Sequence, residues 1–343
     1  MRIAIANDMK MAIESLRRVV ESVSGYEVVW VADNGMEAVK FCARDVPDLI
    51  LMDLIMPEMD GVEATRKIMA HSPCAILVVT ASVTQNVSMV FQAMGAGALD
   101  AVSTPELGFD EQANGRNEFL QKIRTIGRLI SANRRNAPFS HIKHEKSGKS
   151  NDWLIAIGAS TGGPAAVAKV IAKFPADLQA SVVVIQHVDQ SFAPGLAKWL
   201  AQQSFLPIRL AKEGDKIENG RILIAGTNDH LIIKKDHALG YQVEPVSTPY
   251  RPSVDMFFES MLANWHGKSI AVLLTGMGRD GAEGLLELRN SGAFTIAQSA
   301  ETCAVYGMPK AAAELDAAAA ILPVDSIAEA ILNNLAQGRK GAA

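Results

Sequence analysis

Short apolar runs alternate with longer amphipathic stretches along most of this 343-residue chain, and this alternation restricts the fold more than any other feature. Short continuous apolar runs are typical of buried strands, whereas apolar residues spaced three and four apart form one face of a helix. Strands separated by helices pair in parallel, because each helix returns the chain to the same end of the sheet. We therefore predict an α/β protein with mostly parallel sheets.

The alternation occurs in two blocks. From Arg128 to Ser150 the apolar period is lost, and basic residues, serine and proline gather, which is typical of a solvated linker. We predict an N-terminal domain over residues 1–130, a linker over 131–150 and a second domain over 151–343. The length and the 49% hydrophobic content suffice for two packed cores.

The first block predicts a doubly wound sheet. Its expected strands are Arg2–Ala6, Val28–Ala32, Leu49–Met52, Ala75–Val79 and Leu99–Val102. Its expected helices are Met9–Ser24, Met36–Arg44, Gly61–His71, Val83–Met94 and Glu118–Ser131. Sheets of this kind place their site beyond the carboxyl ends of the strands. The polar residues at those ends are Asn7, Asp8, Asp53 and Thr80. Carboxylates gathered there suit a hard cation such as Mg²⁺.

The second block repeats the pattern. Its expected strands are Leu154–Ile157, Ser181–Gln186, Arg221–Ala225, Ser269–Leu274 and Ala293–Ala297. Helices are expected to start near Pro164, Ala193, Ser253, Asp280 and Met308, and the alanine-rich run Ala311–Ala320 also favours a helix. Three short alternating runs predict an antiparallel appendage to a mostly parallel sheet: Ile222–Ile224, Leu231–Lys234 and Tyr241–Glu244.

The first strand of the second block, which starts near Trp153, runs directly into a glycine-rich turn. Ser160 stands in that turn between Gly158 and Gly162, and Pro164 begins the next helix. Glycine permits a sharp bend, and proline suits the first turn of a helix. The bend would present the serine hydroxyl at the carboxyl end of the strand. We therefore predict that Ser160 is a nucleophile.

Two more polar residues follow strands in this block. His187 comes directly after Val-Val-Val-Ile-Gln, and Asp280 lies in the segment Thr275–Gly281. A serine nucleophile needs a base, and a histidine base needs a carboxylate that fixes its tautomer and stabilises its cation. The three residues therefore predict a Ser–His–Asp site.

Each of these residues taken alone has a simpler interpretation. A serine among glycines is often a helix cap or part of a phosphate loop, and Asp280 before Gly281 would suit a helix cap. The order Ser, His, Asp also differs from the Ser, Asp, His order of α/β-hydrolases, although the G-x-S-x-G pattern is present. Nucleotide binding is a further alternative, but GxGxxG is absent and His187 stands where an acidic ribose partner is expected.

The segment around Asp53, Leu-Met-Asp-Leu-Ile-Met-Pro-Glu-Met-Asp-Gly, resembles the phosphoacceptor segment of two-component receiver domains. The resemblance implies a flavodoxin-like domain in which Asp53 is phosphorylated, Asp8 and Asp53 hold Mg²⁺, and Thr80 contacts the phosphoryl group. Two positions depart from the receiver pattern. Asn7 replaces a second acidic residue, and Thr104 replaces the lysine before the proline of the fifth strand.

Several motifs of the second block together resemble the catalytic domain of the chemotaxis protein-glutamate methylesterases. They are Gly158–Pro164, Gln186-His187, Arg251–Asp255, Leu274–Ala282 and Gly307–Pro309. With the receiver segment, the resemblance covers nearly the whole chain. The Asn7 and Thr104 departures, with Ser72–Ile76, are most similar to the subgroup of Wsp-type chemosensory systems.

This resemblance implies phosphorylation-regulated hydrolysis of glutamate γ-methyl esters on chemoreceptors, with deamidation of receptor glutamines as a related activity. Ser160 would be the nucleophile, His187 the base and Asp280 its orienting carboxylate. The backbone amide of Met277 would bind the oxyanion, and Thr161 matches a further active-site position. The esterase would need no cofactor. The partners implied are methyl-accepting chemoreceptors as substrate and a CheA-type histidine kinase as phosphodonor. The alternative is a catalytically weak regulator that binds the receptor or the kinase.

Composition excludes several classes. A formal net charge of −4 and a pI near 6.0 argue against a nucleic-acid binder. The cysteines Cys42, Cys74 and Cys303 have no metal-ligand spacing, which favours a reducing cytoplasm over secretion. No apolar run approaches the roughly 18 residues of a membrane span, so no insertion into a membrane is expected.

Overall fold

The computed structural model describes residues 1–81, 86–105, 116, 119–120, 122–124, 126–127, 152–245, 248 and 250–340. The chain divides into two compact units, Met1–Pro138 and Phe139–Ala343. The predicted linker over residues 131–150 lies outside the described residues, so the domain boundaries stay a prediction. No helix in the described residues is long and apolar enough to cross a membrane.

The first unit contains a parallel sheet with strand order β2-β1-β3-β4-β5. Its strands are β1 (Arg2–Ala6), β2 (Glu27–Ala32), β3 (Leu49–Met52), β4 (Ala75–Thr80) and β5 (Asp100–Ser103). Its helices are α1 (Lys10–Glu21), α2 (Gly35–Arg44), α3 (Gly61–His71) and α4 (Val87–Gly95). This order is that of the flavodoxin-like fold, which confirms the predicted doubly wound sheet. The described residues of the predicted helix Glu118–Ser131 are helical.

The central strands of this sheet are apolar because both of their faces are covered. All residues of β3 are fully buried, and β1 and β4 are buried over most of their length. Polar side chains fix where two of the helices begin. The Asn34 side chain accepts a hydrogen bond from the Glu37 amide at the start of α2, and Asp60 accepts one from the Glu63 amide at the start of α3. Because the strands are parallel, the loops that follow β1, β3 and β4 lie together at the carboxyl edge of the sheet.

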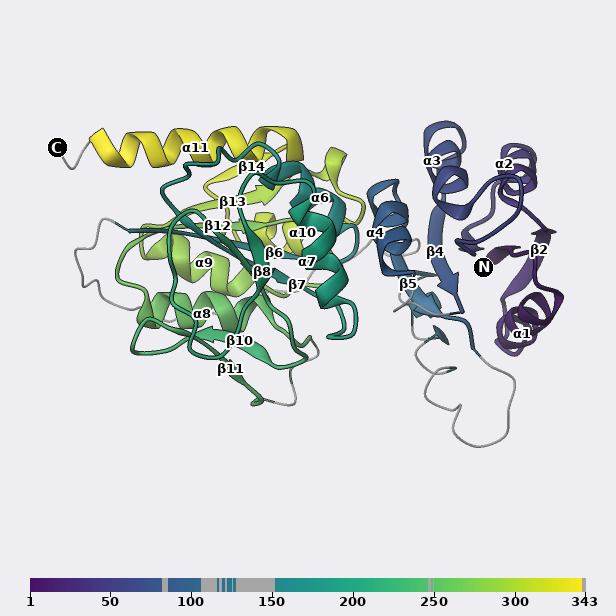
Figure 1. The fold of residues 1–343 in the computed structure, drawn as a ribbon, viewed down its shortest axis with the longest axis horizontal. Helices are drawn as coiled ribbons and strands as arrows, with labels where there is room; N and C mark the ends of the chain where they lie inside the picture. The colour runs from purple at the N-terminus through teal and green to yellow at the C-terminus, as the bar shows by residue number, and fades with distance from the viewer. Residues whose placement is uncertain are drawn as a thin grey trace. The chain divides into compact units, whose positions relative to one another are not determined.

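The second unit contains a larger parallel sheet, with strand order β14-β13-β12-β6-β7-β9-β8 (Figure 1). Its strands are β6 (Trp153–Ala159), β7 (Ser181–Gln186), β8 (Ile208–Leu210), β9 (Ile222–Ile224), β12 (Lys268–Leu273), β13 (Phe294–Gln298) and β14 (Ala320–Leu322). A separate antiparallel pair consists of β10 (His230–Ile233) and β11 (Leu239–Gln242). The predicted appendage is therefore confirmed for two of its three runs. The third, Ile222–Ile224, pairs in parallel with β7 and β8 in the main sheet.

Helices cover the sheet of the second unit. They are α6 (Gly163–Ile171), α7 (Ala193–Ala201), α8 (Val254–Asn264), α9 (Ala282–Asn290), α10 (Met308–Glu314) and α11 (Val324–Lys340). Apolar residues of α8, α9 and α10 share one core with residues from β6, β7 and β12. The alanine-rich run Ala311–Ala320 is helical only to Glu314, and its last residue begins β14. The central strands β7, β6 and β12 lead into the segments that carry His187, Ser160 and Asp280.

Candidate active site and receiver site

The serine of the glycine-rich turn lies directly between β6 and α6. Ser160 is 8% exposed, and its backbone carbonyl accepts a hydrogen bond from the Gly163 amide. Gly162 has φ +74°, and a Cβ there would lie 2.4 Å from the Cβ of Ala304. A Cβ on Gly163 would lie 2.1 Å from Oε1 of Gln186. The turn that presents the serine therefore requires glycine at both positions. Gly162 is needed for its positive φ and for space, and Gly163 for space alone.

Strand pairing brings Ser160 and His187 to the same edge of the sheet. Ala159 of β6 pairs in register with Gln186 of β7, and Ser160 and His187 are the next residues along these neighbouring strands. The Gln186 side chain donates from Nε2 to the Ser160 carbonyl at 2.8 Å, which ties the two strand ends together. The adjacency of the predicted nucleophile and base therefore follows from the register of two parallel strands.

The predicted base and carboxylate are in direct contact. Nε2 of His187 lies 2.7 Å from Oδ2 of Asp280, and both side chains are at least nine-tenths buried. Nδ1 of His187 is buried and has no hydrogen-bond partner among the described residues. The Ser160 hydroxyl likewise makes no hydrogen bond within the described part of the chain, so the Ser–His bond is not formed in this arrangement. Catalytic hydrogen bonds are often open before substrate binds. The ring nitrogen left for the serine is Nδ1.

Asp280 lies against the amino terminus of α8. Its Oδ1 accepts from the Ser253 hydroxyl at 2.7 Å and from the Asp255 amide at 3.2 Å, while its Oδ2 accepts from the Val254 amide at 2.6 Å. A helix amino terminus offers free amides and positive potential to an anion. Burial alone would raise the pKa of Asp280, but its hydrogen bonds with His187, Val254 and Ser253 hold the pKa below its usual value. The carboxylate is therefore ionised and fixed in place.

The amino termini of α8 and α9 hold each other's carboxylates. Asp280 stands just before α9 and is bound by α8, whereas Asp255 stands in the first turn of α8 and accepts from the Gly284 amide of α9 at 2.8 Å. Burial and the charge of Asp280 raise the pKa of Asp255 to about 7. The starts of α8 and α9 are thus joined by two carboxylates. Asp280 ionises more readily than Asp255, because its pKa is lower.

The turn after β12 borders the serine. A Cβ on Gly276 would lie 2.7 Å from the Cβ of Ser160, so the turn and the serine are in close contact. The carbonyl of Gly276 accepts from Gly307 and Met308, whereas the Met277 amide has no acceptor within the described residues. The carbonyl of Thr161 accepts from the Thr275 hydroxyl at 3.0 Å, which joins this turn to the serine turn. Met277 thus has a backbone donor free for a ligand, and Thr161 connects the two turns through its backbone.

The predicted phosphoacceptor, Asp53, lies directly beyond β3 and is 9% exposed. Its Oδ1 accepts from the amides of Leu54 (2.6 Å) and Ile55 (3.5 Å), and its Oδ2 accepts from Nδ2 of Asn7 (3.0 Å). Burial, together with the charge of Asp8, raises the pKa of Asp53 to about 6. The protein therefore supplies donors to this carboxylate but does not offset its charge.

Glycine at position 61 allows α3 to start against the predicted phosphoacceptor, Asp53. A Cβ on Gly61 would lie 1.9 Å from the Asp53 carbonyl oxygen.

Thr80 is 1% exposed at the end of β4, and its hydroxyl accepts from Nδ2 of Asn86. Asn7 is occupied at both ends of its amide, since its Oδ1 accepts from the Met9 amide. Asn7 therefore links the acidic site to the chain that leads into α1.

The donor set at this edge fits Mg²⁺ with one or two carboxylates and waters. No group of three or more His, Cys, Asp or Glu side chains with metal-binding geometry occurs in the described residues. Asp8 is exposed and Asp53 is buried beside it, with a pKa that the nearby charge raises. Mg²⁺ keeps several waters and is commonly held by one or two protein carboxylates. A cation here would remove the repulsion between them.

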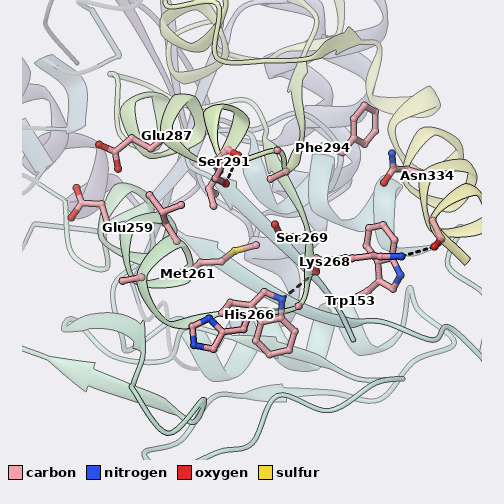
Figure 2. A pocket seen from close by; sticks show the side chains of 18 of the residues that line it. Trp153, Glu259, Met261, His266, Lys268, Ser269, Glu287, Ser291, Phe294 and Asn334 are labelled. Carbon is pink, nitrogen blue, oxygen red and sulfur yellow. Dashed lines mark hydrogen bonds between the residues drawn. The ribbon is translucent and has the colours of Figure 1, made fainter. Parts of the chain in front are cut away.

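A cavity of about 1340 Å³ lies in the second unit, away from Ser160, His187 and Asp280 (Figure 2). Its lining includes Trp153, Lys268 and Phe294, the first residues of β6, β12 and β13. Ser160 and Asp280 lie beyond the opposite ends of β6 and β12, so the cavity is at the far edge of the sheet. Glu259 and Glu287 stand at one side of it in Figure 2. The cavity is separate from the serine site.

Three residues near the predicted Ser–His–Asp group were not predicted as site residues. Ser253 and Asp255 fall in the segment that carried the family resemblance, but no role followed from it. Tyr250 stacks on His187, with ring centroids 4.6 Å apart and 6° between the planes. Their contacts join segments far apart in the sequence, so only a motif shared with relatives could have indicated them.

Comparisons with known proteins agree with this architecture. Residues 155–331 match the CheB methylesterase family, and residues 3–108 match the response regulator receiver domain. The chain is 53% identical to protein-glutamate methylesterase/protein-glutamine glutaminase 3 of Pseudomonas aeruginosa, over 96% of this chain and 98% of that protein. It is also 53% identical to the protein-glutamate methylesterase/protein-glutamine glutaminase of Mesorhizobium japonicum, over 97% and 98%.

A solved structure resembles the second unit. The crystal structure of the Thermotoga maritima CheB methylesterase catalytic domain has 34% sequence identity and a TM-score of 0.51, and it covers 55% of this chain and 98% of that one. Both the family match and the relatives span the unit that contains Ser160, His187 and Asp280. The chain therefore belongs to the CheB methylesterase family and carries a response regulator receiver domain in front of its methylesterase domain.

Proposed function

We propose that this protein hydrolyses glutamate γ-methyl esters on chemoreceptors, releasing methanol, and that it also deamidates receptor glutamines. The relatives named above are protein-glutamate methylesterases and protein-glutamine glutaminases. One observation carries the proposal for this chain. Nε2 of His187 is held by Asp280 at 2.7 Å while its buried Nδ1 is left without a partner in the described part of the chain, one strand away from Ser160. A base held in this way is ready to accept a serine proton.

The chemistry follows from these positions. Ser160 attacks the ester carbonyl as His187 takes its proton at Nδ1, and Asp280 stabilises the imidazolium. The Met277 amide donates to the oxyanion. The carbon–oxygen bond to the methoxy group then breaks, and His187 returns the proton to the departing methanol. Water, activated by the same imidazole, releases the glutamate and restores the serine. No step uses a cofactor.

Methanol release from a methylated chemoreceptor tests the proposal. Ser160→Ala should lower the rate at least about a thousandfold, because the nucleophile is lost. Ser291→Ala is a matched control, since Ser291 lines the cavity at the far edge of the sheet and should leave the rate unchanged. A Ser160→Ala rate equal to wild type would overturn the proposal. Receptor binding without any methanol release by wild type would favour the alternative of a binding regulator.

We further propose that Asp53 accepts a phosphoryl group from a CheA-type histidine kinase. Asp8 and Asp53 would hold Mg²⁺, which neutralises the charge that builds up during phosphoryl transfer. Thr80, buried at the end of β4, would contact the phosphoryl group. Labelling with a phosphodonor should be lost in Asp53→Asn and on removal of Mg²⁺ with a chelator. Equal labelling of Asp53→Asn and wild type would overturn this assignment.

The setting of the activity is a chemosensory pathway in the cytoplasm. The receiver domain and the methylesterase domain together are typical of chemosensory adaptation. The Asn7 and Thr104 departures favour a Wsp-type system over flagellar chemotaxis. Deletion of the gene from a strain with both systems tests this choice: altered surface signalling with normal swimming chemotaxis is expected, and the reverse result would contradict it.

A further inference from the structure

Tyr250 contacts two parts of the serine site at once. Its ring lies parallel to the imidazole of His187, with centroids 4.6 Å apart and 6° between the planes. Its hydroxyl packs against Gly278, where a Cβ would lie 2.3 Å from the phenol oxygen. Gly278 directly follows Met277, whose amide is the candidate oxyanion donor. One side chain thus spans the base and the turn that would bind the oxyanion.

The ring contact restricts the imidazole in a way that the carboxylate does not. His187 is held at Nε2 by Asp280, whereas its Nδ1 has no partner in the described part of the chain. A single hydrogen bond leaves the ring free to rotate about the bond that it makes. A parallel aromatic ring at 4.6 Å restricts the imidazole to one plane. Together the ring contact and the bond to Asp280 fix the orientation of the imidazole, and with it the position of Nδ1.

The hydroxyl contact leaves a donor beside the oxyanion turn. Within the described residues the Tyr250 hydroxyl has no hydrogen-bond partner, although the side chain is partly buried. Gly278 has φ +86° and no side chain, so the phenol oxygen lies directly against the backbone of the turn. A neutral phenol donates one hydrogen bond. Burial, and then the charge of Asp280, raise the pKa of Tyr250, so the phenol keeps its proton at neutral pH.

We propose that Tyr250 positions His187 through its ring and donates a hydrogen bond from its hydroxyl to the oxyanion that forms beside Met277. This inference rests on the esterase function proposed above and assigns a further residue to that site. The phenol proton stays on the tyrosine throughout, so the hydroxyl stabilises charge without acid–base transfer. A donor that strengthens only as the carbonyl oxygen becomes negative raises kcat and leaves KM largely unchanged.

Two substitutions separate the roles of the ring and the hydroxyl. Tyr250→Phe keeps the stacked ring and removes the donor, so kcat for methanol release should fall roughly 10- to 100-fold with little change in KM. Tyr250→Leu removes both, so kcat should fall further. Tyr241→Phe is the matched control. Its hydroxyl donates to Ala211 and accepts from Gly226, outside the serine site, so its loss should leave kcat unchanged.

A spectroscopic readout tests the ring without using activity. The Nε2 proton of His187, held in the bond to Asp280, should give a low-field proton resonance in wild type and in Tyr250→Phe. In Tyr250→Leu the resonance should broaden or vanish, because the imidazole is no longer restricted and water reaches it. An unchanged resonance in Tyr250→Leu would overturn the positioning role.

The kinetic outcomes also separate this inference from the function on which it rests. An active wild type matched in kcat by Tyr250→Phe would overturn the donor role alone. A wild type no more active than Ser160→Ala would overturn the esterase function, and the donor role with it.

Discussion

Asp280 and Asp53 are both buried carboxylates beyond central strands of parallel sheets, yet the protein surrounds them differently. Asp280 binds an imidazole, a hydroxyl and two helix amides, and its pKa lies below the usual value. Asp53 binds two loop amides and the Asn7 side chain, and burial together with the charge of Asp8 raises its pKa to about 6. Burial disfavours charge in both sites, but only one carboxylate has partners that outweigh it.

The two sites differ in where the positive charge that offsets each carboxylate comes from. Asp280 contacts His187 of its own chain, which would become positive in the reaction proposed above, so the charge of Asp280 has a partner within the protein. Asp53 has an acidic neighbour in Asp8 and a threonine, Thr104, where receivers place a lysine. A bound cation such as Mg²⁺ would offset this charge and that of a phosphoryl group on Asp53. The proposed catalytic site is thus preorganised by the protein, whereas the receiver site needs a bound ligand to offset its charge.

The largest effect is expected from Asp280→Asn, which breaks the preorganised site. An amide cannot stabilise the imidazolium and favours the wrong tautomer of His187, so methanol release should fall roughly 10³- to 10⁴-fold. The rate is measured on methylated receptor, with circular dichroism to verify folding. Asp177→Asn, an exposed aspartate between α6 and β7, is the control. A folded Asp280→Asn variant that retains a tenth of the wild-type rate would show that the carboxylate is dispensable.

A smaller effect is expected when one donor to Asp280 is removed. Ser253→Ala deletes the hydroxyl that lies 2.7 Å from Oδ1 of Asp280, so kcat should fall roughly tenfold or more. Ser253 also caps α8 through the Met256 amide, so the free energy of unfolding should fall by about 1 kcal/mol. Ser253→Thr keeps the hydroxyl and should restore kcat.

Ser260 separates the two consequences of Ser253→Ala. Its hydroxyl lies in the same helix, where it donates to the Phe257 carbonyl and accepts from the Ile233 amide. Ser260→Ala should therefore lower stability and leave kcat unchanged. A parallel loss of kcat in Ser260→Ala would mean that Ser253 acts only through the stability of α8.

Sequence reasoning found the strands and residues whose signals are local. The residues that determine the local structure lie within a few positions of one another in the apolar run of β6, the glycines around Ser160 and the Asp53 segment. In the structure Ser160 and Asp53 directly follow the buried strands β6 and β3, at the strand ends where they were expected. The edge strands β8 and β14 were missed because none of their three residues is fully buried, so neither forms a distinct apolar run, in contrast to the fully buried β9. The alanine run ending at Ala320 favours a helix by propensity, but parallel pairing with β13 decides its last residue.

The supporting groups of the site could not be predicted for a different reason. Ser253 and Asp255 act on Asp280 and α9 across roughly 25 to 29 positions of the chain, and nothing near either residue marks a partner. Tyr250 stacks on His187, which directly follows β7, from a distant part of the chain. Such contacts depend on tertiary packing, which a single sequence does not specify by pattern.

A third carboxylate at the receiver site would test the contrast between the charge of Asp53 and that of Asp280. In Asn7→Asp the donor to Asp53 is replaced by a third carboxylate, so the affinity for Mg²⁺ should rise about tenfold. Without Mg²⁺ the new repulsion should lower the free energy of unfolding by about 1 kcal/mol or more. Calorimetric titration with Mg²⁺ measures the first change and thermal unfolding the second. Asn34→Asp is the control, because either side chain can cap α2. Unchanged Mg²⁺ affinity in Asn7→Asp would show that Asn7 lies outside the metal's influence.

The smallest effect concerns the second carboxylate of the catalytic unit, Asp255. Burial and the charge of Asp280 raise its pKa to about 7 in the folded chain, against about 3.9 for an ordinary aspartate. Between these two values the folded state binds more protons than the unfolded state, so this group's contribution to stability falls as pH rises through the window. The amide in Asp255→Asn does not titrate. Relative to wild type, the variant should therefore gain about 1 kcal/mol or more between pH 5 and pH 8.

Denaturant unfolding of both proteins at the two pH values measures this difference directly. The amide oxygen that Asp255→Asn introduces can still accept from Gly284, so the lock between α8 and α9 is kept and only the charge is removed. A stability difference that stays constant with pH would mean that Asp255 ionises normally beside Asp280. The catalytic unit would then carry two charged carboxylates at its helix starts, and its site would resemble the receiver site in holding uncompensated charge.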